Sequence, residues 1–277
     1  MFLVVGCNGQ LGNELKLLLQ DKAIYVDKDE LDITDKNAVD SFFAEHNVDA
    51  IINCAAYTAV DKAESDIENA RLVNATATKY LAQSTAKQNI PFIHISTDYV
   101  FDGMISEHRK ETDEVNPINI YGQTKLEGED LALAINPRTI IIRTSWVYSK
   151  YGNNFVKTML RLFQERTELN VINDQIGSPT NAMDLAEVII QIVLSQKITY
   201  GIFNYSNEGK CSWFDFALKI KEFSNSNITI NPIPTTAYPT PAKRPNFSLL
   251  DKSKIKTTYQ ISVPDWESSL ERMIIGE

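Results

Sequence analysis

The stretch Phe-Leu-Val-Val-Gly-Cys-Asn-Gly-Gln-Leu-Gly-Asn-Glu-Leu, residues 2–15, decides the fold of this chain. Its first four residues form a short apolar run, which is typical of a strand buried on both faces of a parallel sheet. Gly6, Gly9 and Gly12 follow at intervals of three, and leucines at positions 11, 15, 18 and 19 recur at helical spacing. Free amides and the helix dipole at such a helix start favour a pyrophosphate. The stretch predicts a nucleotide-binding turn, and a tight turn without a ligand is the alternative.

An acidic residue stands where the second strand should end. Asp27 lies twenty-one residues past Gly6, directly after the apolar run 23–26. An acid at this place accepts hydrogen bonds from the adenosine ribose of a dinucleotide. Its charge would repel a 2′-phosphate and favour NADH, whereas the neighbouring Lys28 would attract that phosphate. Both NADH and NADPH therefore stay open as cofactors, and a plain turn role for Asp27 is the alternative.

Strand-like and helix-like segments alternate along the first half of the chain. Further apolar runs at 50–53, 91–95 and 139–142 are separated by helical patterns at 36–46, 68–88 and 121–134. This alternation predicts an α/β fold with a doubly wound parallel sheet of the Rossmann type. Beyond about residue 150 we expect helices near 154–165, 182–195 and 213–223, and short strands at 169–172, 201–205 and 228–230. Residues 231–245 hold five of the ten prolines, which predicts a loop with a restricted backbone.

We expect a nucleotide-binding Rossmann domain over residues 1–148 and a smaller α/β substrate region over 149–277, some segments of which return to pack on the first domain. The length of 277 residues and a hydrophobic content of 43% supply ample core. A net charge of −9 argues against nucleic acid and membrane surfaces as partners. The three scattered cysteines are typical of reduced thiols. No apolar run has the length of a membrane span. We therefore expect a cytoplasmic protein.

Tyr121 and Lys125, in the stretch Tyr-Gly-Gln-Thr-Lys, are the strongest catalytic candidates. Their spacing puts a phenol and an ammonium one helical turn apart on the same face of a helix. A free tyrosine has a pKa near ~10, and a fixed positive charge nearby favours the phenolate. We therefore expect Lys125 to lower the pKa of Tyr121 toward the working range of an enzyme. Taken alone, such a pair is more often a solvated surface contact.

Three further segments lie at strand ends or just beyond, where open parallel sheets bind ligands. Residues 53–61 read Asn-Cys-Ala-Ala-Tyr-Thr-Ala-Val-Asp, and the small side chains of Ala55 and Ala56 would let a cofactor lie close. Residues 95–103 read Ile-Ser-Thr-Asp-Tyr-Val-Phe-Asp-Gly, where a hydroxyl could hydrogen-bond a substrate carbonyl or merely cap a turn. Residues 143–148 read Arg-Thr-Ser-Trp-Val-Tyr, whose Trp could pack on a sugar ring or a nicotinamide, or simply join the core.

Together with the glycine turn, these segments resemble the extended short-chain dehydrogenase/reductase family, and within it the reductases of dTDP-linked keto-sugars. The likeness rests on Gly-Gln-Leu-Gly, Ala-Ala-Tyr-Thr-Ala-Val-Asp-Lys-Ala-Glu, Ser-Thr-Asp-Tyr-Val-Phe-Asp-Gly, Tyr-Gly-Gln-Thr-Lys-Leu-Glu-Gly-Glu and Arg-Thr-Ser-Trp-Val-Tyr. The likeness continues through residues 152–162, 173–180, 212–217 and 241–245, and so covers nearly the whole chain. The second half matters most, because the Tyr-Lys pair identifies only the superfamily.

The resemblance implies an enzyme that reduces the C4 ketone of dTDP-4-dehydro-L-rhamnose with NADPH or NADH and gives dTDP-L-rhamnose. On the family's pattern Thr97 and Tyr121 hold the substrate oxygen, and Lys125 holds the nicotinamide ribose. The sugar would also meet Asp98 and Trp146. The residues expected at the cofactor are Gly6, Gly9, Gln10, Leu11, Gly12, Asp27, Asp32, Ile33, Ala55, Ala56, Tyr57, Thr58, Ile95, Tyr121 and Lys125.

The dTDP group carries a pyrophosphate, and a chain with a net charge of −9 offers it no general attraction. A local cation must therefore offset the charge of that pyrophosphate. Arg244 is the best candidate, because Pro241 and Pro245 stiffen its loop and a guanidinium fork suits phosphate oxygens. The alternative is that Arg244 merely tops a solvent-exposed loop.

The family pattern leaves a metal and some rival functions open. Some members are described as homodimers bridged by a metal that an acid after the glycine turn binds. Glu14 matches that acid, so Mg²⁺ and a homodimer stay open, but the other ligands find no match and we predict no metal site. The rivals are a sugar-nucleotide epimerase or dehydratase of the same superfamily, and a non-catalytic regulatory subunit like that of methionine adenosyltransferase. A dehydratase would place an Asp-Glu pair beside Thr97, whereas Asp98 is followed by Tyr99.

Overall fold

The predicted central sheet is present in the computed structural model, which describes residues 1–276. Six strands lie in the order β10-β5-β4-β3-β1-β2, and every neighbouring pair is parallel. The strands are β1 (Phe2–Val5), β2 (Ala23–Val26), β3 (Ala50–Asn53), β4 (Phe92–Thr97), β5 (Thr139–Thr144) and β10 (Gly201–Asn204). The doubly wound α/β fold is thereby confirmed, and the first three strands have the predicted bounds.

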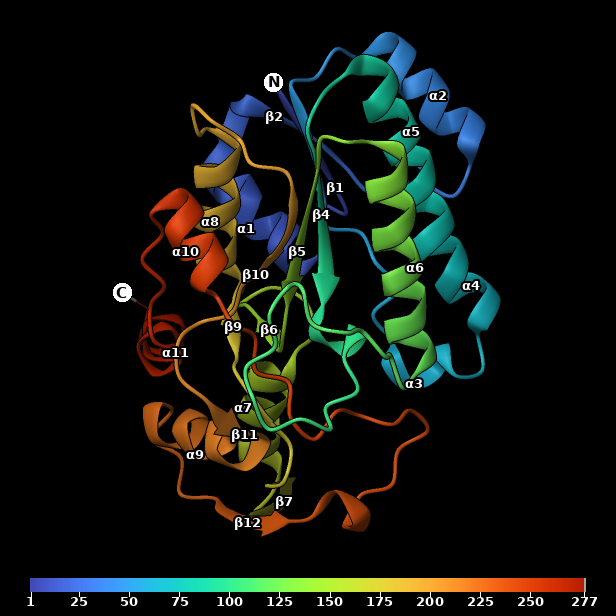
Figure 1. Cartoon of the computed structure of the whole chain (residues 1–277). Coiled ribbons are helices and arrows are strands. Elements are labelled where there is room, and N and C mark those ends of the chain that lie inside the picture. Colours follow the sequence, from blue (N-terminus) through green and yellow to red (C-terminus); the bar gives the residue numbers. More distant parts are fainter. Residues whose placement is uncertain (277) are drawn as a thin grey trace.

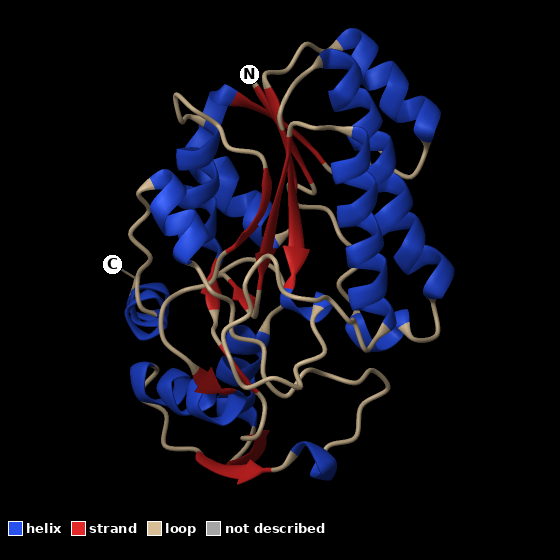
Figure 2. Ribbon diagram, in the orientation of Figure 1, coloured by secondary structure: helices blue, strands red, loops and turns tan. Residues whose placement is uncertain are grey.

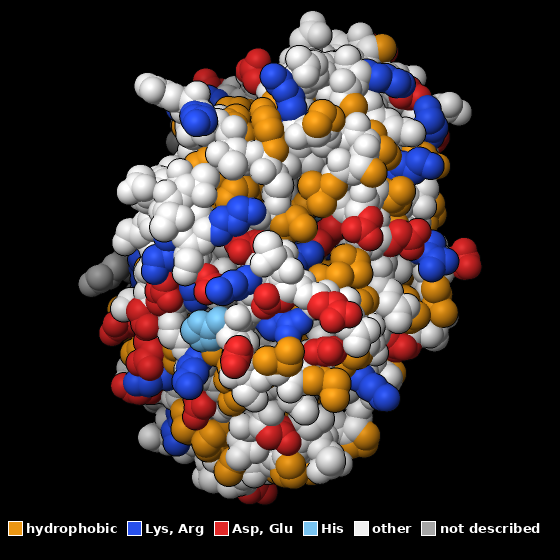
Figure 3. Space-filling view, in the orientation of Figure 1, with side chains coloured by type: hydrophobic (Ala, Val, Ile, Leu, Met, Phe, Trp, Pro, Cys, Tyr) orange, Lys and Arg blue, Asp and Glu red, His pale blue; other side chains and the backbone are white. Residues whose placement is uncertain are grey.

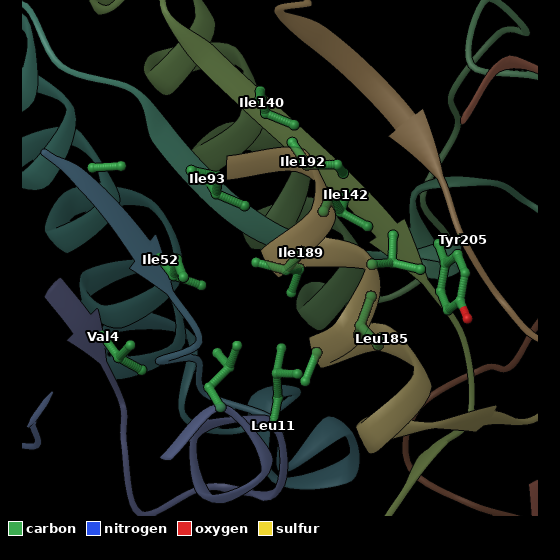
Figure 4. Packing of buried hydrophobic residues seen from close by; sticks show 14 of the residues in the cluster. Val4, Leu11, Ile52, Ile93, Ile140, Ile142, Leu185, Ile189, Ile192 and Tyr205 are labelled. Carbon is green, nitrogen blue, oxygen red and sulfur yellow. The ribbon is translucent and has the colours of Figure 1, made fainter. Parts of the chain in front are cut away.

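Helices cover both faces of the sheet (Figures 1 and 2). One face carries α1 (Gln10–Leu19), α8 (Ala182–Val193) and α10 (Ser253–Tyr259), and the other carries α2 (Lys36–Glu45), α5 (Ala77–Gln88) and α6 (Ile120–Ile135). Because side chains alternate along a strand, Val4, Ile52 and Ile93 pack with α1 and α8 (Figure 4). Their strand neighbours Leu3, Ile51 and Phe92 belong to the apolar cluster on the opposite face. Burial on both faces explains why these strands read as continuous apolar runs.

The predicted helix over 68–88 is divided in the structure. It comprises α4 (Ile67–Arg71), a π-helical turn (Leu72–Thr76) and α5, and the short α3 (Val60–Ala63) precedes them. The side chain of Asn74 in this π-helical turn is buried, and it forms hydrogen bonds with the backbone of Tyr57 and the hydroxyl of Thr124. Single π turns are frequent near functional sites, and this one ties the loop after β3 to α6.

The second half of the chain builds a smaller layered region beside the sheet. Its helices are α7 (Phe155–Glu165), α9 (Trp213–Phe223) and α11 (Trp266–Ile275), and β7 (Glu168–Ile172) pairs in parallel with β12 (Thr229–Ile233). Two short pairs also form here: β6 (Val147–Tyr148) with β9 (Thr180–Asn181), and β8 (Ile176–Gly177) with β11 (Cys211–Ser212). A separate apolar cluster that contains Val156, Phe216 and Trp266 lies between these elements. By contrast, β10 is an edge strand of the central sheet, and α8 and α10 pack on that sheet. The domain boundary at residue 148 therefore stays a prediction.

The prediction that residues 231–245 form a loop is wrong for the first three of these residues, which belong to a strand. The strand β12 continues through Pro232 to Ile233, and a 3-10 turn follows at Thr235–Ala237. Proline is tolerated at this position because β12 is one edge of a two-stranded sheet, where a missing N–H breaks few ladder bonds. The helices α10 and α11 were not expected; both are short, and α10 carries few apolar residues.

Charged side chains of both signs are interspersed over the face of the molecule shown in Figure 3. Within residues 1–276, no helix combines the length and the apolar character needed to cross a membrane.

Candidate active site

A cleft of about 880 Å³ lies along the carboxyl ends of the central strands. The chain leaves β1 toward β2 on one side and toward β3, β4 and β5 on the other, so the strand order reverses beside β1. Ligands of open parallel sheets bind at such a reversal. The loops that follow β1, β2, β3 and β4 all contribute residues to the wall of the cleft. Its volume lies at the upper end of the usual range for ligand sites, roughly 300–1,000 Å³.

The glycine turn after β1 is shaped for a close approach. Gly6 has φ +75°, and a Cβ there would come within 2.6 Å of the Ala55 nitrogen. Gly9 is the N-cap of α1 and lines the cleft together with Gln10 and Leu11. Gly12 does not line the cleft. It is needed for packing, because a Cβ at this position would come within 2.4 Å of the Gly6 carbonyl oxygen. The exposed N-terminus of α1 therefore fits a pyrophosphate.

The far end of the cleft is lined by residues that follow β2. The Asp27 carboxylate accepts hydrogen bonds from the backbone N–H groups of Asn8 at 3.0 Å and Lys28 at 2.8 Å. It thereby holds the glycine turn in place as well as facing the cleft. Asp32, Ile33 and Thr34 continue this wall, and Thr34 bonds the Asp32 carboxylate and holds the pKa of that group below its usual value. Lys28 also lines the cleft, so a cation stands beside the two acids.

Tyr121 and Lys125 both reach the cleft from α6, as the spacing predicts. Lys125 is fully buried, and its Nζ donates to the Ile95 carbonyl oxygen at 2.6 Å. Burial lowers the pKa of Lys125 to about 8, although Glu129 and Cys54 oppose this shift.

The expected lowering of the Tyr121 pKa is wrong for this structure. Burial raises the pKa of Tyr121 to about 12, the nearby Thr97 hydroxyl lowers it, and the Asp98 charge raises it further. The Lys125 nitrogen bonds the Ile95 carbonyl oxygen, and its charge is not among the effects that shift the pKa of Tyr121. Tyr121 is therefore a protonated phenol at neutral pH.

Thr97 and Asp98 stand at the end of β4 beside the phenol. The Thr97 hydroxyl donates to Asp98 Oδ1 at 3.0 Å and accepts from the Tyr99 N–H at 3.1 Å, so it also caps the 3-10 turn Asp98–Val100. Burial raises the pKa of Asp98 to about 7, while bonds from Ser248 and Thr97 oppose this. Both proposed roles of Thr97, in the turn and in the site, are compatible with its position.

Two indoles form one wall of the cleft. The Trp146 and Trp213 rings are stacked with centroids 3.6 Å apart and an interplanar angle of 11°. Gly177 lies against the six-membered ring of Trp146, where a Cβ would come within 2.7 Å of Cε2 and Cζ2. Trp146 also has φ 48°, which is rare for a bulky side chain. The pair leaves Trp146 less free to stack on a sugar than the sequence suggests, and brings Trp213 into the site.

The structure gathers most of the predicted site residues in this one cleft. Those that line it are Gly6, Gly9, Gln10, Leu11, Asp27, Asp32, Ile33, Ala55, Ala56, Thr58, Ile95, Thr97, Asp98, Tyr121, Lys125 and Trp146. Tyr57 lies just outside, with its hydroxyl on Asp66 Oδ2 at 2.8 Å. Arg244 also lies outside, because its guanidinium forms a two-pronged pair with Asp61 at 3.0 and 2.7 Å.

Several cleft residues had no predicted role. They include Val60, Val73, Ser145, Asn153, Leu185 and Trp213. Trp213 stands in the quoted segment 212–217, and a large aromatic residue at a helix start was the available signal. Val73 reaches the cleft through the π turn and Leu185 through the packing of α8, which no local pattern reveals.

Glu14, the acid that the family pattern links with a metal, is buried and accepts from the Ser149 hydroxyl at 2.6 Å. Among residues 1–276, no group of three His, Cys, Asp or Glu side chains is arranged to hold a metal ion. The donor set around Glu14 therefore does not fit a metal within one chain.

Several known proteins with a similar sequence and the same fold are dTDP-4-dehydrorhamnose reductases by name. A family model described as "RmlD substrate binding domain" matches residues 1–276. A dTDP-4-dehydrorhamnose reductase from Aggregatibacter actinomycetemcomitans is 44% identical, over 98% of this chain and 97% of that protein. The crystal structure of a dTDP-4-dehydrorhamnose reductase from Bacillus anthracis in complex with NADP has a TM-score of 0.96 and 39% identity, over 100% of this chain and 99% of that one. One from Clostridium acetobutylicum has a TM-score of 0.95 and 42% identity, over 99% and 98%. The chain belongs to the dTDP-4-dehydrorhamnose reductase family.

Proposed function

We propose that this chain reduces the C4 ketone of dTDP-4-dehydro-L-rhamnose to dTDP-L-rhamnose with NADPH. The observation that carries the proposal is the meeting of Thr97, Tyr121 and Lys125 in the same cleft as a glycine turn. The family membership supplies the substrate, because relatives that carry the reductase name match nearly the whole chain at 44% and 40% identity. A solved relative holds NADP, which supports the same cofactor here.

The nicotinamide supplies a hydride to C4, and the protein must supply a proton to the C4 oxygen. We assign this proton to Tyr121, whose raised pKa of about 12 keeps the phenol protonated at neutral pH. Thr97 is assigned to the same substrate oxygen, since its hydroxyl is close enough to the phenol to lower the pKa of Tyr121. Lys125 is assigned to the nicotinamide ribose, because its buried Nζ lines the cleft beside the end of β4.

In this proposal the cofactor binds at one end of the cleft and the sugar nucleotide binds at the other. The amides of the glycine turn face the cofactor pyrophosphate, and Asp27 faces the adenosine ribose. Lys28 offsets the Asp27 charge, which supports acceptance of a 2′-phosphate. The sugar is assigned to the opposite end, beside Asp98, Trp146 and the substrate region 149–277. The dTDP pyrophosphate is assigned to Arg244, which lies outside the cleft lining on a loop that Asp61 anchors.

A cytoplasmic location and a homodimer remain parts of the proposal. The three cysteines are free thiols, which suits a reducing compartment. The homodimer rests on the family resemblance alone, and sedimentation velocity of the purified chain would test it.

The decisive experiment follows NADPH absorbance during incubation with dTDP-4-dehydro-L-rhamnose and identifies the product by NMR. We expect one NADPH to be consumed for each dTDP-L-rhamnose formed, and the Tyr121→Phe variant serves as the matched control. An epimerase or a dehydratase would convert a sugar nucleotide without net NADPH consumption. A regulatory subunit would leave the keto-sugar unchanged, and either result would overturn the proposal.

A further inference from the structure

A buried histidine stands directly behind Lys125. His94 lies in the middle of β4, has no exposed surface, and pairs in register with Asn53 of β3. Its Nε2 is 3.2 Å from Lys125 Nζ, and its Nδ1 is 3.0 Å from Asn53 Nδ2. Neither the family pattern nor the mechanism above uses this residue. A buried polar ring between Ile93 and Ile95, packed against a catalytic lysine, requires a physical account.

The hydrogen-bond chain fixes the position of the histidine proton. The Ala55 backbone N–H can only donate, and it points to Asn53 Oδ1 at 3.1 Å. The Asn53 amide therefore presents its NH₂ group to His94 Nδ1, which must accept. Burial, reinforced by the Lys125 charge, lowers the pKa of His94 well below its ordinary value, so the ring is neutral. A neutral imidazole carries one N–H, and this one must be on Nε2.

The consequence falls on Lys125. The His94 Nε2–H points at a nitrogen 3.2 Å away, and an ammonium has no lone pair to accept it. A neutral amine has one, and it can accept from His94 while it still donates to the Ile95 carbonyl. His94 therefore stabilises the uncharged form of Lys125 and opposes the charged form.

We propose that His94 is a positioning residue whose Nε2–H holds the Lys125 nitrogen at the cleft wall and favours the neutral amine. Lys125 then exchanges its proton closer to neutral pH than a solvated lysine does. This inference deepens the proposed function, because it assigns the protonation state of Lys125 to a residue of a neighbouring strand.

The other groups around Lys125 act in known directions. His94 and the Ile95 carbonyl face its nitrogen from β4, Cys54 faces it from the loop after β3, and Glu129 lies one turn further along α6. Glu129 and Cys54 raise the pKa of Lys125, whereas burial lowers it to about 8. Glu129 is itself held by Arg143 of β5 through bonds of 2.6 to 3.1 Å, so its charge is largely offset. Of the two groups that contact the nitrogen within hydrogen-bond distance, the Ile95 carbonyl belongs to the backbone, so His94 is the one that a substitution can remove.

The first test needs neither substrate nor a His94 variant. The chain has three histidines, so ¹⁵N-histidine NMR of the intact protein resolves each ring, with His46→Gln and His108→Gln for assignment. We expect the His94 ring to be neutral with its proton on Nε2 at neutral and mildly acidic pH. A ring protonated on Nδ1, or charged in mildly acidic buffer, would overturn the proposal whatever the enzyme's substrate proves to be.

The second test measures the pH dependence of kcat/KM in two variants. The carbonyl oxygen of His94→Gln can accept from the ammonium, so the alkaline limb that reports Lys125 should move upward by about one pH unit, the shift expected for one such hydrogen bond. The His94→Asn side chain keeps a partner for Asn53 but withdraws from Lys125, so a smaller upward move is expected. His46→Gln is the matched control, because His46 contacts Phe42 on α2, and its profile should equal the parent's. An alkaline limb that stays in place or moves downward in both His94 variants, with a uniform loss of kcat, would show that His94 only fills space.

Discussion

Replacement of Arg244 by alanine should weaken binding of the dTDP-sugar without weakening binding of NADPH. The guanidinium is held by Asp61 through two bonds, by Thr240 Oγ1 at 2.6 Å and by the Ala242 carbonyl at 3.1 Å. These contacts fix the loop between Pro241 and Pro245 close to α3. The cation is therefore ordered in advance, but part of its charge is already offset by a carboxylate.

The structure supplies the magnitude and the control for this prediction. A hydrogen bond from a guanidinium to a phosphate oxygen is worth ~1.5–3 kcal/mol, which is about ten- to a hundredfold in KM. The Asp61→Asn variant removes the competing carboxylate and keeps an amide oxygen for the same loop. If Arg244 meets the pyrophosphate, KM for the sugar nucleotide should rise strongly in Arg244→Ala and stay equal or fall in Asp61→Asn.

Steady-state kinetics with varied dTDP-sugar measures both KM values, and fluorescence titration gives the Kd for NADPH. Arg244→Lys adds a finer comparison, because it keeps the charge and loses the fork. Equal damage from the Arg244→Ala and Asp61→Asn substitutions would mean that the pair only anchors its loop. Parallel losses of sugar and NADPH binding would also refute the assignment, since the NADPH pyrophosphate belongs to the glycine turn.

Three further predictions concern the cleft. Tyr121→Phe should lower kcat on the order of 10²–10⁴-fold and leave the NADPH Kd unchanged, and near-normal turnover would remove Tyr121 from the mechanism. Asp27→Ala should shift the ratio of kcat/KM values toward NADPH over NADH, from a starting preference of no more than about tenfold in either direction, and an unchanged ratio would show that Asp27 acts on the glycine turn alone. Asp98→Asn should stabilise the protein above neutral pH. Because burial raises the pKa of Asp98 to about 7, the folded parent becomes less stable as the pH rises from the ordinary carboxyl pKa to about 7, where the buried carboxyl must ionise. The gain at mildly alkaline pH should be at most about 4 kcal/mol and should vanish in acid, as thermal unfolding at both pH values would reveal.

The sequence predicted the central sheet well because its signals are local. The strands β1 and β2 are four-residue apolar runs followed by Gly6 and Asp27, and β3 is a three-residue apolar run that ends in Asn53. The apolar run and the residue that ends it therefore mark the same boundary. The second half has weaker signals, since β6, β8, β9 and β11 are two residues long and exist only through their partners. The placement of β10 beside β5 is likewise a matter of packing, because its four residues read like any other short strand.

Site residues at the ends of parallel strands could be predicted from the sequence, whereas those whose positions depend on contacts between distant segments could not. The carboxyl ends of parallel strands meet at one edge, so Gly6, Asp27, Ala55 and Thr97 could be brought together from their order alone. The partner of Arg244 is 183 residues away in Asp61, and no local pattern announces it. The stacking of Trp213 on Trp146 depends in the same way on two distant segments.

The pKa of Tyr121 illustrates why spacing alone misleads about electrostatics. A unit charge at about 4 Å in a protein interior contributes roughly 4 kcal/mol at an effective dielectric constant near 20, or about three pKa units. That gain requires the ammonium to face the phenol, whereas the Lys125 nitrogen bonds the Ile95 carbonyl and approaches His94. Burial is therefore the largest effect on both groups: it raises the pKa of Tyr121 to about 12 against the Thr97 hydroxyl, and lowers that of Lys125 to about 8 against Glu129 and Cys54. Ketone reduction consumes a proton, and a protonated phenol can donate one, whereas oxidation of the alcohol would need the phenolate. The protein alone thus sets its tyrosine for reduction, and any shift toward phenolate must come from the ligands that enter the cleft.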